Sequence, residues 1–322
     1  MAGPSRTLAV DLGAGLVLPT PVMVAAGCSG TGRELAGLVD LRKVGALVSR
    51  SVTVLPRKGS PSPRVAETPS GVVWDTGWQN PGIEAFMADE LPRLARGGVR
   101  IVVSIGGSTL EEVVRLTSAL QGHPDAAAIE LNLSVPDEEL SRPVLGAHVD
   151  RVSEIVGAAA RLSLVPVFAK LPGGVGGIAN LATAAVRAGA HGLTLSGSPP
   201  ALVADAEHLR AQLGGVTGWL SGPALRPLTL RAVFEVTQAI RDVPIIAVGG
   251  LRSGEDAVEM LLAGAWAVQV GVASLVDPAA PVTIAQGVAR YLKAKNLASP
   301  ADARGRLRVP TASPGVVDGS AS

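Results

Sequence analysis

The sequence predicts an α/β protein built as one (β/α)8 TIM barrel, and three features of the chain point to this fold. Eight short runs of β-branched and other apolar residues recur along its 322 residues. Stretches with the apolar spacing of an amphipathic helix separate most of these runs. Each run ends in small or polar residues, as strands do where a barrel builds its active-site loops. Strands that alternate with helices favour a parallel sheet, and eight of them close into a barrel.

The predicted elements follow one another in chain order. Strands are expected at 21–27, 46–53, 101–107, 128–134, 165–171, 191–197, 243–250 and 267–272. Helical periodicity is clearest at 84–98, 109–122, 148–162 and 253–265. The last of these helices begins with Glu255 and Asp256, where the helix dipole favours negative charge.

Three segments do not fit this alternation. Residues 8–18 hold two short apolar runs around a pair of glycines, which predicts an N-terminal hairpin that closes the bottom of the barrel. Residues 198–226 are too long for a simple strand-to-helix connection, so we expect an inserted segment on the C-terminal face, over the site. Residues 298–322 are small, polar and rich in Pro and Gly, which predicts a disordered tail after a single domain, 1–297.

Composition excludes several classes of function. With 47% hydrophobic and 17% charged residues, the chain can bury one large core. A formal net charge of +1 and 2% aromatic residues argue against nucleic acid as a partner. The single cysteine, Cys28, cannot form an internal disulfide, and the N-terminus lacks the layout of a secretory signal. No apolar run reaches the roughly 20 residues of a membrane span, so we expect a cytoplasmic protein that binds a small molecule.

Glycines predict a phosphate site at the ends of the last two strands. Gly249 and Gly250 follow the seventh strand, and Gly271 and Val272 follow the eighth. Free backbone N–H groups near helix N-termini stabilise phosphate, and this architecture usually holds phosphate at these two strands. The stretch 221–223 is a third candidate. The alternative is that these glycines only form tight turns.

Polar side chains are expected on the inner rim at two other strand ends. Lys170 ends the fifth strand, and a buried ammonium group needs an anionic or electron-rich partner, unless it belongs to a structural ion pair. Asn132 and Ser134 alternate with Leu133, so both are expected to face a ligand inside the barrel, or else to cap the strand. The cysteine and the four histidines have no metal-ligand spacing, so no metal is predicted.

Longer motifs resemble a known family. The most specific are SPSPRVAETPSG at 60–71 and QNPGIEAF at 79–86, and IELNLSVP at 129–136 and the long run at 245–274 agree with them. On these residues the chain from 21 to 276 resembles the soluble, class 1 dihydroorotate dehydrogenases. That family consists of FMN-dependent barrel enzymes of pyrimidine biosynthesis. The resemblance therefore implies an oxidoreductase that acts on a CH–CH group, with FMN as its cofactor.

The resemblance also implies where FMN would bind. Ala25, Ala26 and Gly27 would lie under the flavin ring. Lys170 would face the pyrimidine end of the ring and stabilise charge on the reduced form. Backbone groups would hold the phosphate at Gly222, Gly249, Gly250, Gly271 and Val272. The remaining cofactor positions are Arg50, Ser51, Ser104 and Asn132.

Two of these positions depart from the family pattern. Arg50 stands where the family has a lysine, and Ser104 stands where it has an asparagine. Arginine keeps the charge of lysine but not its shape, so we expect flavin affinity or potential to differ.

The implied substrate side departs much further. The family's proton-accepting cysteine or serine aligns with Val135, which has no group that can act as a base. Ser134 is a weak candidate to replace it, because side chains at adjacent extended positions point to opposite sides and Ser134 should not reach the site unless the loop rearranges. The asparagines that surround the family's substrate align with Asn132, which is kept, and with Trp74, Asp137 and Gly197, which are not. Asp137 would place a negative charge toward a substrate carboxylate.

Three readings follow. The chain is an FMN oxidoreductase that oxidises dihydroorotate by a modified mechanism or takes a less anionic substrate; or it binds flavin without turnover, as a partner or regulatory subunit; or its barrel uses the phosphate site for something other than flavin. The family usually forms dimers, so a homodimer is expected, with an electron-transfer subunit as a possible partner.

Overall fold

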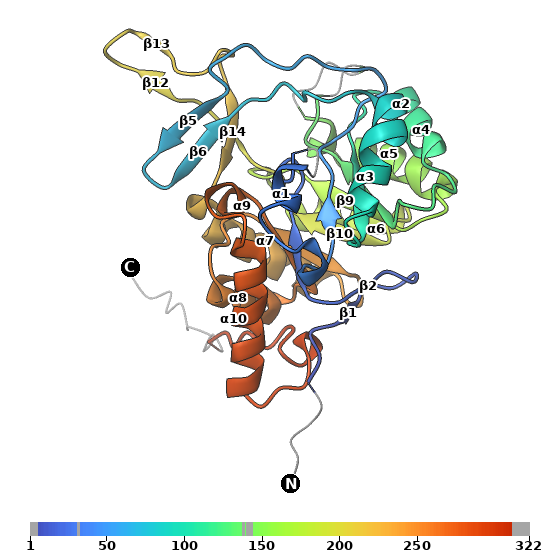
Figure 1. Cartoon of the computed structure of the whole chain (residues 1–322), viewed down its shortest axis with the longest axis vertical. Helices are drawn as coiled ribbons and strands as arrows, with labels where there is room; N and C mark the ends of the chain where they lie inside the picture. Colours follow the sequence, from blue (N-terminus) through green and yellow to red (C-terminus); the bar gives the residue numbers. More distant parts are fainter. Residues whose placement is uncertain (1–5, 31–32, 137–138, 140–143, 311–322) are drawn as a thin grey trace, which may run out of the picture.

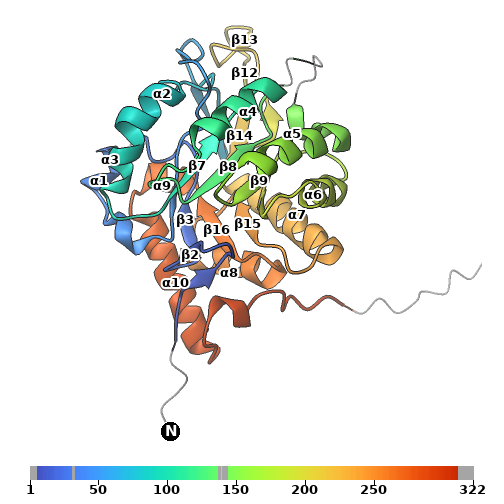
Figure 2. The same ribbon diagram turned by 90° about the vertical axis from the view of Figure 1, so that its right-hand side faces the viewer.

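A closed barrel of eight parallel strands forms the centre of the molecule, with helices around it (Figures 1 and 2). The computed structural model describes residues 6–30, 33–136, 139 and 144–310. The strand order around the barrel is β10-β15-β16-β3-β4-β7-β8-β9. These strands are β3 (Val22–Val24), β4 (Leu47–Val48), β7 (Ile101–Ile105), β8 (Ala128–Asn132), β9 (Val167–Leu171), β10 (Gly192–Leu195), β15 (Ile245–Val248) and β16 (Ala267–Val270). The TIM barrel and the position of each predicted strand are confirmed.

Helices cover the outside of the barrel. They are α1 (Arg33–Ala36), α2 (Ile83–Ala85), α3 (Leu91–Ala95), α4 (Leu110–Ala119), α5 (Val149–Leu162), α6 (Ile178–Arg187), α7 (Arg226–Ala239), α8 (Gly254–Ala263), α9 (Val272–Val276) and α10 (Ala280–Ala294). A π-helical turn, η2 (Phe86–Glu90), joins α2 to α3, and short 3-10 turns lie at η1 (Leu41–Lys43), η3 (Leu145–Ala147), η4 (Pro223–Leu225) and η5 (Pro300–Asp302). The four predicted helical stretches are confirmed.

Side-chain caps fix where two of these helices begin. Thr109 accepts a hydrogen bond of 3.1 Å from the N–H of Glu112 at the start of α4. Ser253 and Asp256 each accept the other's backbone N–H, which forms a capping box at the start of α8. Both caps lie on the side of the barrel where the strands end, so they fix the loops that follow β7 and β15.

The N-terminal hairpin closes the bottom of the barrel, as the sequence predicts. Its strands are β1 (Val10–Asp11) and β2 (Val17–Leu18), paired antiparallel. Leu12, Leu16 and Leu18 are buried and belong to one apolar cluster with the lower interior residues of the barrel, which are Met23, Ala46, Val48, Val102, Ala128, Phe168, Ile246 and Ala267. The barrel is therefore filled from below, and any ligand has to enter at the carboxyl ends of the strands.

The inserted segment and the hairpin at 65–74 together form a second sheet beyond those strand ends. Its order is β11 (Pro200–Ala201), β14 (Gly218–Ser221), β6 (Gly71–Trp74) and β5 (Val65–Thr68). A further pair within the inserted segment, β12 (Ala204–Asp205) with β13 (Arg210–Ala211), forms a separate two-stranded sheet. Figure 1 shows this sheet projecting from the barrel at the end away from the N-terminus. The β5–β6 hairpin is absent from the sequence prediction.

Residues 298–310 differ from the expectation of a disordered tail. Ala303 is fully buried, and Arg304 stacks over the Trp266 ring with 3.7 Å between its guanidinium carbon and the ring centroid. The N–H groups of Gly305 and Leu307 donate to Leu261 and Leu262 carbonyls at 3.0 and 2.9 Å. These backbone bonds and one small buried side chain hold the segment despite its polar composition. Residues 311–322 lie outside the described part of the chain.

In the described ranges, no helix is both long and apolar enough to cross a membrane.

Candidate active site

Two groups of predicted phosphate residues and one group of predicted flavin-ring residues lie at the carboxyl ends of three adjacent barrel strands. Since β15, β16 and β3 are neighbours, Gly249, Gly271 and Gly27 follow strands that lie side by side. A Cβ added to Gly271 would lie 3.8 Å from Ala25 Cβ, whereas one added to Gly27 would meet nothing within 4 Å. The backbone next to Gly27 therefore borders open space at the top of the barrel.

Two glycines allow close backbone contacts here. Gly250 has φ +82°, and a Cβ on it would lie 2.2 Å from the Arg226 nitrogen, where α7 begins. Gly222 has φ +108°, and its Cβ would lie 2.6 Å from the Cα of Gly71. A larger residue would separate the β15 loop from α7, or the β14 loop from the β5–β6 hairpin. These glycines are needed for packing as well as for any ligand.

The cradle formed by these loops fits a phosphate. Within the described ranges, the backbone N–H groups of Gly250, Gly271 and Val272 have no hydrogen-bond acceptor. Unpaired backbone N–H groups at the ends of two adjacent strands are a typical anion site. The arrangement agrees with the FMN phosphate position that the resemblance implies.

Hydroxyl and amide groups line the next part of the rim. Ser51 Oγ lies 2.8 Å from Ser104 Oγ and accepts a hydrogen bond of 2.9 Å from Asn132 Nδ2. The N–H of Ser134 donates to Asn132 Oδ1 at 3.0 Å. The structure thus brings three predicted cofactor residues into one buried chain of hydrogen bonds. Ser104, in place of an amide, donates or accepts here through a single hydroxyl group.

Lys170 lies inside the barrel in an ion pair. Its Nζ donates to Glu130 Oε1 at 3.0 Å, and the two side chains are 11% and 1% exposed. Glu130 also accepts from Thr194 and Gln269. Sequence reasoning missed these three residues, although their polar side chains within apolar strands were a signal. Both readings of Lys170, ion pair and ligand contact, are compatible with this geometry.

Arg50 is directed toward the helices beside the site. Its Nη1 donates to the Gln79 carbonyl at 3.4 Å, and its Nε lies 3.9 Å from Glu90 Oε2 in the π-helical turn. The Nε itself is buried without a hydrogen-bond partner among the described residues. Arg50 therefore adds positive charge near the rim, but the contacts that it makes are with protein.

Val135 and Ser134 point to different neighbours. Val135 is 2% exposed, and its Cγ1 lies 3.2 Å from where a Cβ on Gly106 would be. Ser134 Oγ lies 2.3 Å from where a Cβ on Gly197 would be, and in the described structure it has no hydrogen-bond partner. β8 ends at Asn132, so the alternation expected for an extended strand does not continue to these residues.

Trp74 lies at the end of β6, in the sheet of the inserted segment. Its indole N–H donates to Ser221 Oγ at 2.8 Å, and Ser221 Oγ lies 2.6 Å from Ser198 Oγ. Gly197 directly precedes Ser198, so these hydrogen bonds connect Trp74 to the residue next to a second substrate position. Asp137 lies outside the described residues.

Cys28 lies close to the same loops. Its Sγ is 3.7 Å from the position of a Cβ on Gly271. Burial raises the pKa of the thiol to about 11, while the charge of Lys170 acts in the opposite direction. The thiol is therefore protonated at neutral pH and unsuited to act as a nucleophile or base.

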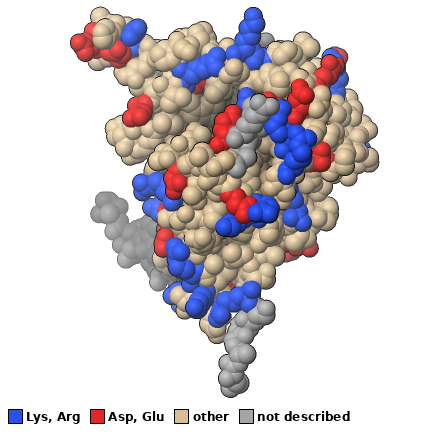
Figure 3. Space-filling view, in the orientation of Figure 1, with Lys and Arg blue, Asp and Glu red and all other residues tan. Residues whose placement is uncertain are grey.

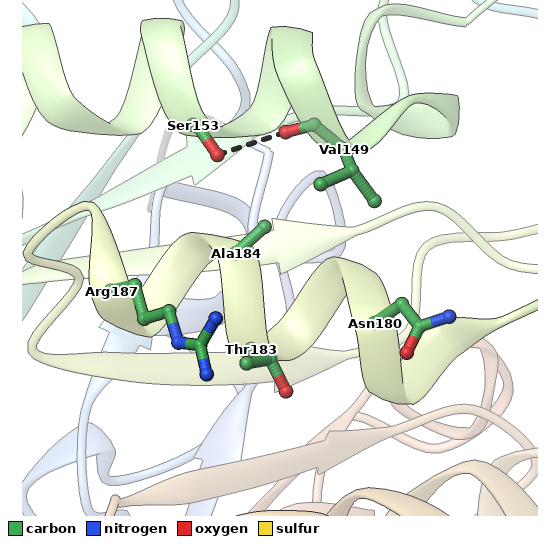
Figure 4. Close-up of a pocket in the computed structure, with 6 residues that line it drawn as sticks. All are labelled: Val149, Ser153, Asn180, Thr183, Ala184 and Arg187. Carbon is green, nitrogen blue, oxygen red and sulfur yellow. Dashed lines mark hydrogen bonds between the residues drawn. The ribbon is translucent and has the colours of Figure 1, made fainter.

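Surface features elsewhere contain none of the predicted residues. A groove of about 360 Å³ on the outside of the barrel is lined by Val149 and Ser153 of α5 and Asn180, Thr183, Ala184 and Arg187 of α6 (Figure 4). On the face drawn in Figure 3, acidic and basic side chains are interspersed. No group of three or more His, Cys, Asp or Glu side chains in the described ranges could hold a metal ion.

Comparisons with known proteins agree with this geometry. A family model described as dihydroorotate dehydrogenase matches residues 8–292. The chain is 45% identical over 279 residues to the dihydroorotate dehydrogenase B (NAD(+)), catalytic subunit, of Desulforudis audaxviator, covering 87% of this chain and 91% of that protein. It is 38% identical over 309 residues to the subunit of the same name in Geotalea daltonii, covering 96% and 100%. It is 42% identical over 271 residues to the subunit of the same name in Geobacillus kaustophilus, covering 84% of this chain and 86% of that protein.

Proposed function

Because this chain belongs to the dihydroorotate dehydrogenase family, whose members are FMN-dependent oxidoreductases, we propose that it oxidises a CH–CH bond in a ring of the dihydroorotate type. The observation that supports this most is the pair of loops after β15 and β16, where the backbone N–H groups of Gly250, Gly271 and Val272 have no acceptor among the described residues. One barrel domain holds every candidate residue. FMN, when bound there, accepts a hydride from the substrate.

The residues of this site have separate tasks. Gly222, Gly249, Gly250, Gly271 and Val272 bind the phosphate through their backbone, and Ala25, Ala26 and Gly27 support the flavin ring. The Ser104–Ser51–Asn132 chain orients the amide of Asn132 at the rim. Lys170 supplies the positive charge that stabilises the reduced flavin. Arg50 contributes positive charge from farther away, because its hydrogen bond is to the Gln79 carbonyl.

Proton removal differs from the usual family mechanism. Val135 is buried and carries no acceptor, and losing a general base typically lowers the rate by about 10²–10⁴. Ser134 is the candidate for this task because its hydroxyl is buried and unpaired among the described residues. We therefore propose slow oxidation of dihydroorotate, in which Ser134 or water receives the proton.

The altered binding positions favour a less anionic substrate over dihydroorotate itself. Trp74 offers an aromatic surface where the family has a small amide, and its N–H is already bonded to Ser221. Gly197 offers no side chain at all. A ring without a carboxylate loses less from these changes than dihydroorotate does, because it leaves no buried charge unpaired.

A second candidate is an FMN-binding subunit without turnover of its own. It is favoured by the apolar packing of Val135 against Gly106, at the position of the missing base.

The relatives are named as catalytic subunits of an NAD(+) enzyme, so we propose an electron-transfer partner subunit for this chain. We also propose that the chain forms a homodimer. We place the protein in the cytoplasm.

An anaerobic spectroscopic experiment tests the proposal. The purified protein should show flavin absorption with one FMN per chain, and dihydroorotate should bleach it orders of magnitude more slowly than it bleaches a relative with the usual base. A protein that is colourless and takes up no FMN would refute the proposal. Bound FMN that no dihydropyrimidine reduces would leave the second candidate as the function.

A further inference from the structure

Four side chains from four strands meet inside the barrel at a single carboxylate. Glu130 of β8 accepts hydrogen bonds from Lys170 Nζ of β9 at 3.0 Å, Thr194 Oγ1 of β10 at 3.1 Å and Gln269 Nε2 of β16 at 2.6 Å. Glu130, Thr194 and Gln269 are fully buried. A charge removed from water to this extent is tolerated because it is paired and hydrogen-bonded.

The bonds to Glu130 are divided between its two oxygens. Among the described residues, Oε1 accepts from Lys170 alone, whereas Oε2 accepts from both Thr194 and Gln269. The carboxylate cannot rotate without breaking the two bonds at Oε2. Oε1 is therefore held facing Lys170, and this limits the positions that the ammonium group can take.

The ammonium group keeps further donors available. A lysine has three N–H donors, and Glu130 is the one hydrogen-bond partner of Lys170 within the described ranges. Lys170 pairs in register with Asn132 on one side and with Thr194 on the other, so its side chain starts in the top layer of the barrel. The apolar cluster with Phe168 and Met23 fills the barrel below. The apolar cluster below offers these donors no acceptor, so they are available to a ligand at the rim.

We propose that Glu130 is a positioning residue, which holds the ammonium group of Lys170 toward the flavin and so sets how strongly Lys170 stabilises the reduced cofactor. This inference rests on the proposed binding of FMN. Stability alone is a weak reason for the pair, since replacing a buried ion pair by apolar residues is often neutral or stabilising. A cation that is held in place by a carboxylate and keeps free donors is suited to stabilise negative charge that develops nearby.

The charge balance of the redox step explains the requirement. Oxidised FMN gains two electrons and one proton as a hydride, and the reduced form carries a negative charge on its pyrimidine end. The attraction between that charge and a cation depends steeply on their separation inside a protein. A small displacement of Lys170 therefore alters the midpoint potential. Glu130 adds an opposing negative charge of its own, so the potential of a single variant does not separate the two effects.

A double-mutant cycle on the midpoint potential separates them. The potential of bound FMN is measured by spectroelectrochemical titration in the wild type, Glu130→Gln, Lys170→Met and the double variant. If Glu130 positions Lys170, the shift caused by Lys170→Met falls to less than about half in the Glu130→Gln background, because coupled residues are non-additive. An equal shift in both backgrounds, with FMN bound, would overturn the inference.

The shift caused by Lys170→Met is also measured in two further variants, which control for misfolding and for the general effect of removing a carboxylate. Glu130→Asp keeps the charge but withdraws it by one methylene, so the Lys170→Met shift should again be reduced, and an undiminished shift would count against the inference. Glu235→Gln removes an exposed carboxylate paired with Arg231 at 2.7 Å and should leave the shift unchanged. A wild-type protein that takes up no FMN would refute the proposed function instead, so the two failures are distinguishable.

Discussion

The indole N–H of Trp74 donates a hydrogen bond of 2.8 Å to Ser221 Oγ. Trp74 ends β6 and Ser221 ends β14, two neighbouring strands of the inserted sheet. The residue after Ser221 is Gly222, whose backbone is proposed to bind phosphate. One hydrogen bond therefore connects the altered substrate side to the proposed phosphate loop.

Replacing Trp74 by Phe should weaken FMN binding. The ring surface remains, but Ser221 loses its indole donor, and a hydrogen bond of this kind contributes about 0.5–1.5 kcal/mol. If that stabilisation holds the loop in place for the phosphate, the Kd for FMN rises by about 2- to 10-fold. Fluorescence titration of the apoprotein with FMN measures it. Trp219→Phe is the matched control, since Trp219 pairs with Trp74 in register and its indole N–H has no partner in the described structure. Equal weakening in both variants would show that the hydrogen bond is not responsible.

Replacing Gly250 by Ala should destabilise the fold. The new Cβ would lie 2.2 Å from the backbone nitrogen of Arg226, in addition to the strain of φ +82°. A backbone neighbour cannot rotate away, so we expect a loss of more than about 2 kcal/mol in the free energy of unfolding. Gly15→Ala is the control, because Gly15 has φ +80° but no atom within 4 Å of the added Cβ. Urea denaturation of both apoproteins gives the comparison, and equal losses would mean that strain alone accounts for the effect.

Cys28 should react slowly with iodoacetamide. Burial raises its pKa to about 11, so at pH 8 only about one thiol in 10³ is ionised, and the thiolate is the reactive form. The reaction should therefore become faster as the pH rises from 8 toward 10. Lys170→Met should slow it further, because the lysine charge favours the thiolate. Cys28 is the only cysteine in the chain, so mass spectrometry reports its modification directly. Modification at pH 8 as fast as that of a free thiol peptide would contradict the expectation.

Most of the barrel could be predicted because its signals are local. Each strand is a short apolar run, and glycines mark the loops after β15 and β16. The β5–β6 hairpin was missed because its strands have four residues each and are stabilised by pairing with β14, which is distant in sequence. Residues 298–310 were expected to be disordered on composition, whereas backbone bonds to Leu261 and Leu262 hold them. Composition does not report such bonds.

In the candidate site, too, some positions could be predicted from the sequence and others could not. The strand-end positions of Lys170 and Asn132 follow from the period of two in a strand. Glu130 could not be identified as the partner of Lys170, because Thr194 and Gln269 reach it only after the barrel closes. Ser134 and Val135 lie beyond the end of β8, where the strand period no longer applies. The contacts of Ser134 with Gly197 and of Val135 with Gly106 depend on the turn after β8 and on packing.

Restoring the base alone should restore little activity. Val135→Cys places a thiol beside Gly106, but a base contributes only when the substrate lies within hydrogen-bonding reach. Trp74 would still occupy the position of a small amide, and the asparagines that the family has at positions 137 and 197 would still be missing. We expect the first-order rate of flavin reduction by dihydroorotate to rise less than about tenfold in this single variant. A larger recovery would show that the substrate positions were never the obstacle.

Restoring the base together with the amides should raise the rate far more than the separate changes do. The variant Val135→Cys with Trp74→Asn, Asp137→Asn and Gly197→Asn returns both the proton acceptor and the ligands, and groups that act together are strongly non-additive. The asparagine at 197 needs the space that Ser134 Oγ now takes, 2.3 Å from the new Cβ, so Ser134 must rotate. Its unpaired hydroxyl can then bond to the amide, which makes the rotation favourable. Anaerobic stopped-flow reduction of the single, triple and quadruple variants measures the effect. A quadruple variant that is folded and loaded with FMN but stays inert would show that these four positions do not form the substrate site.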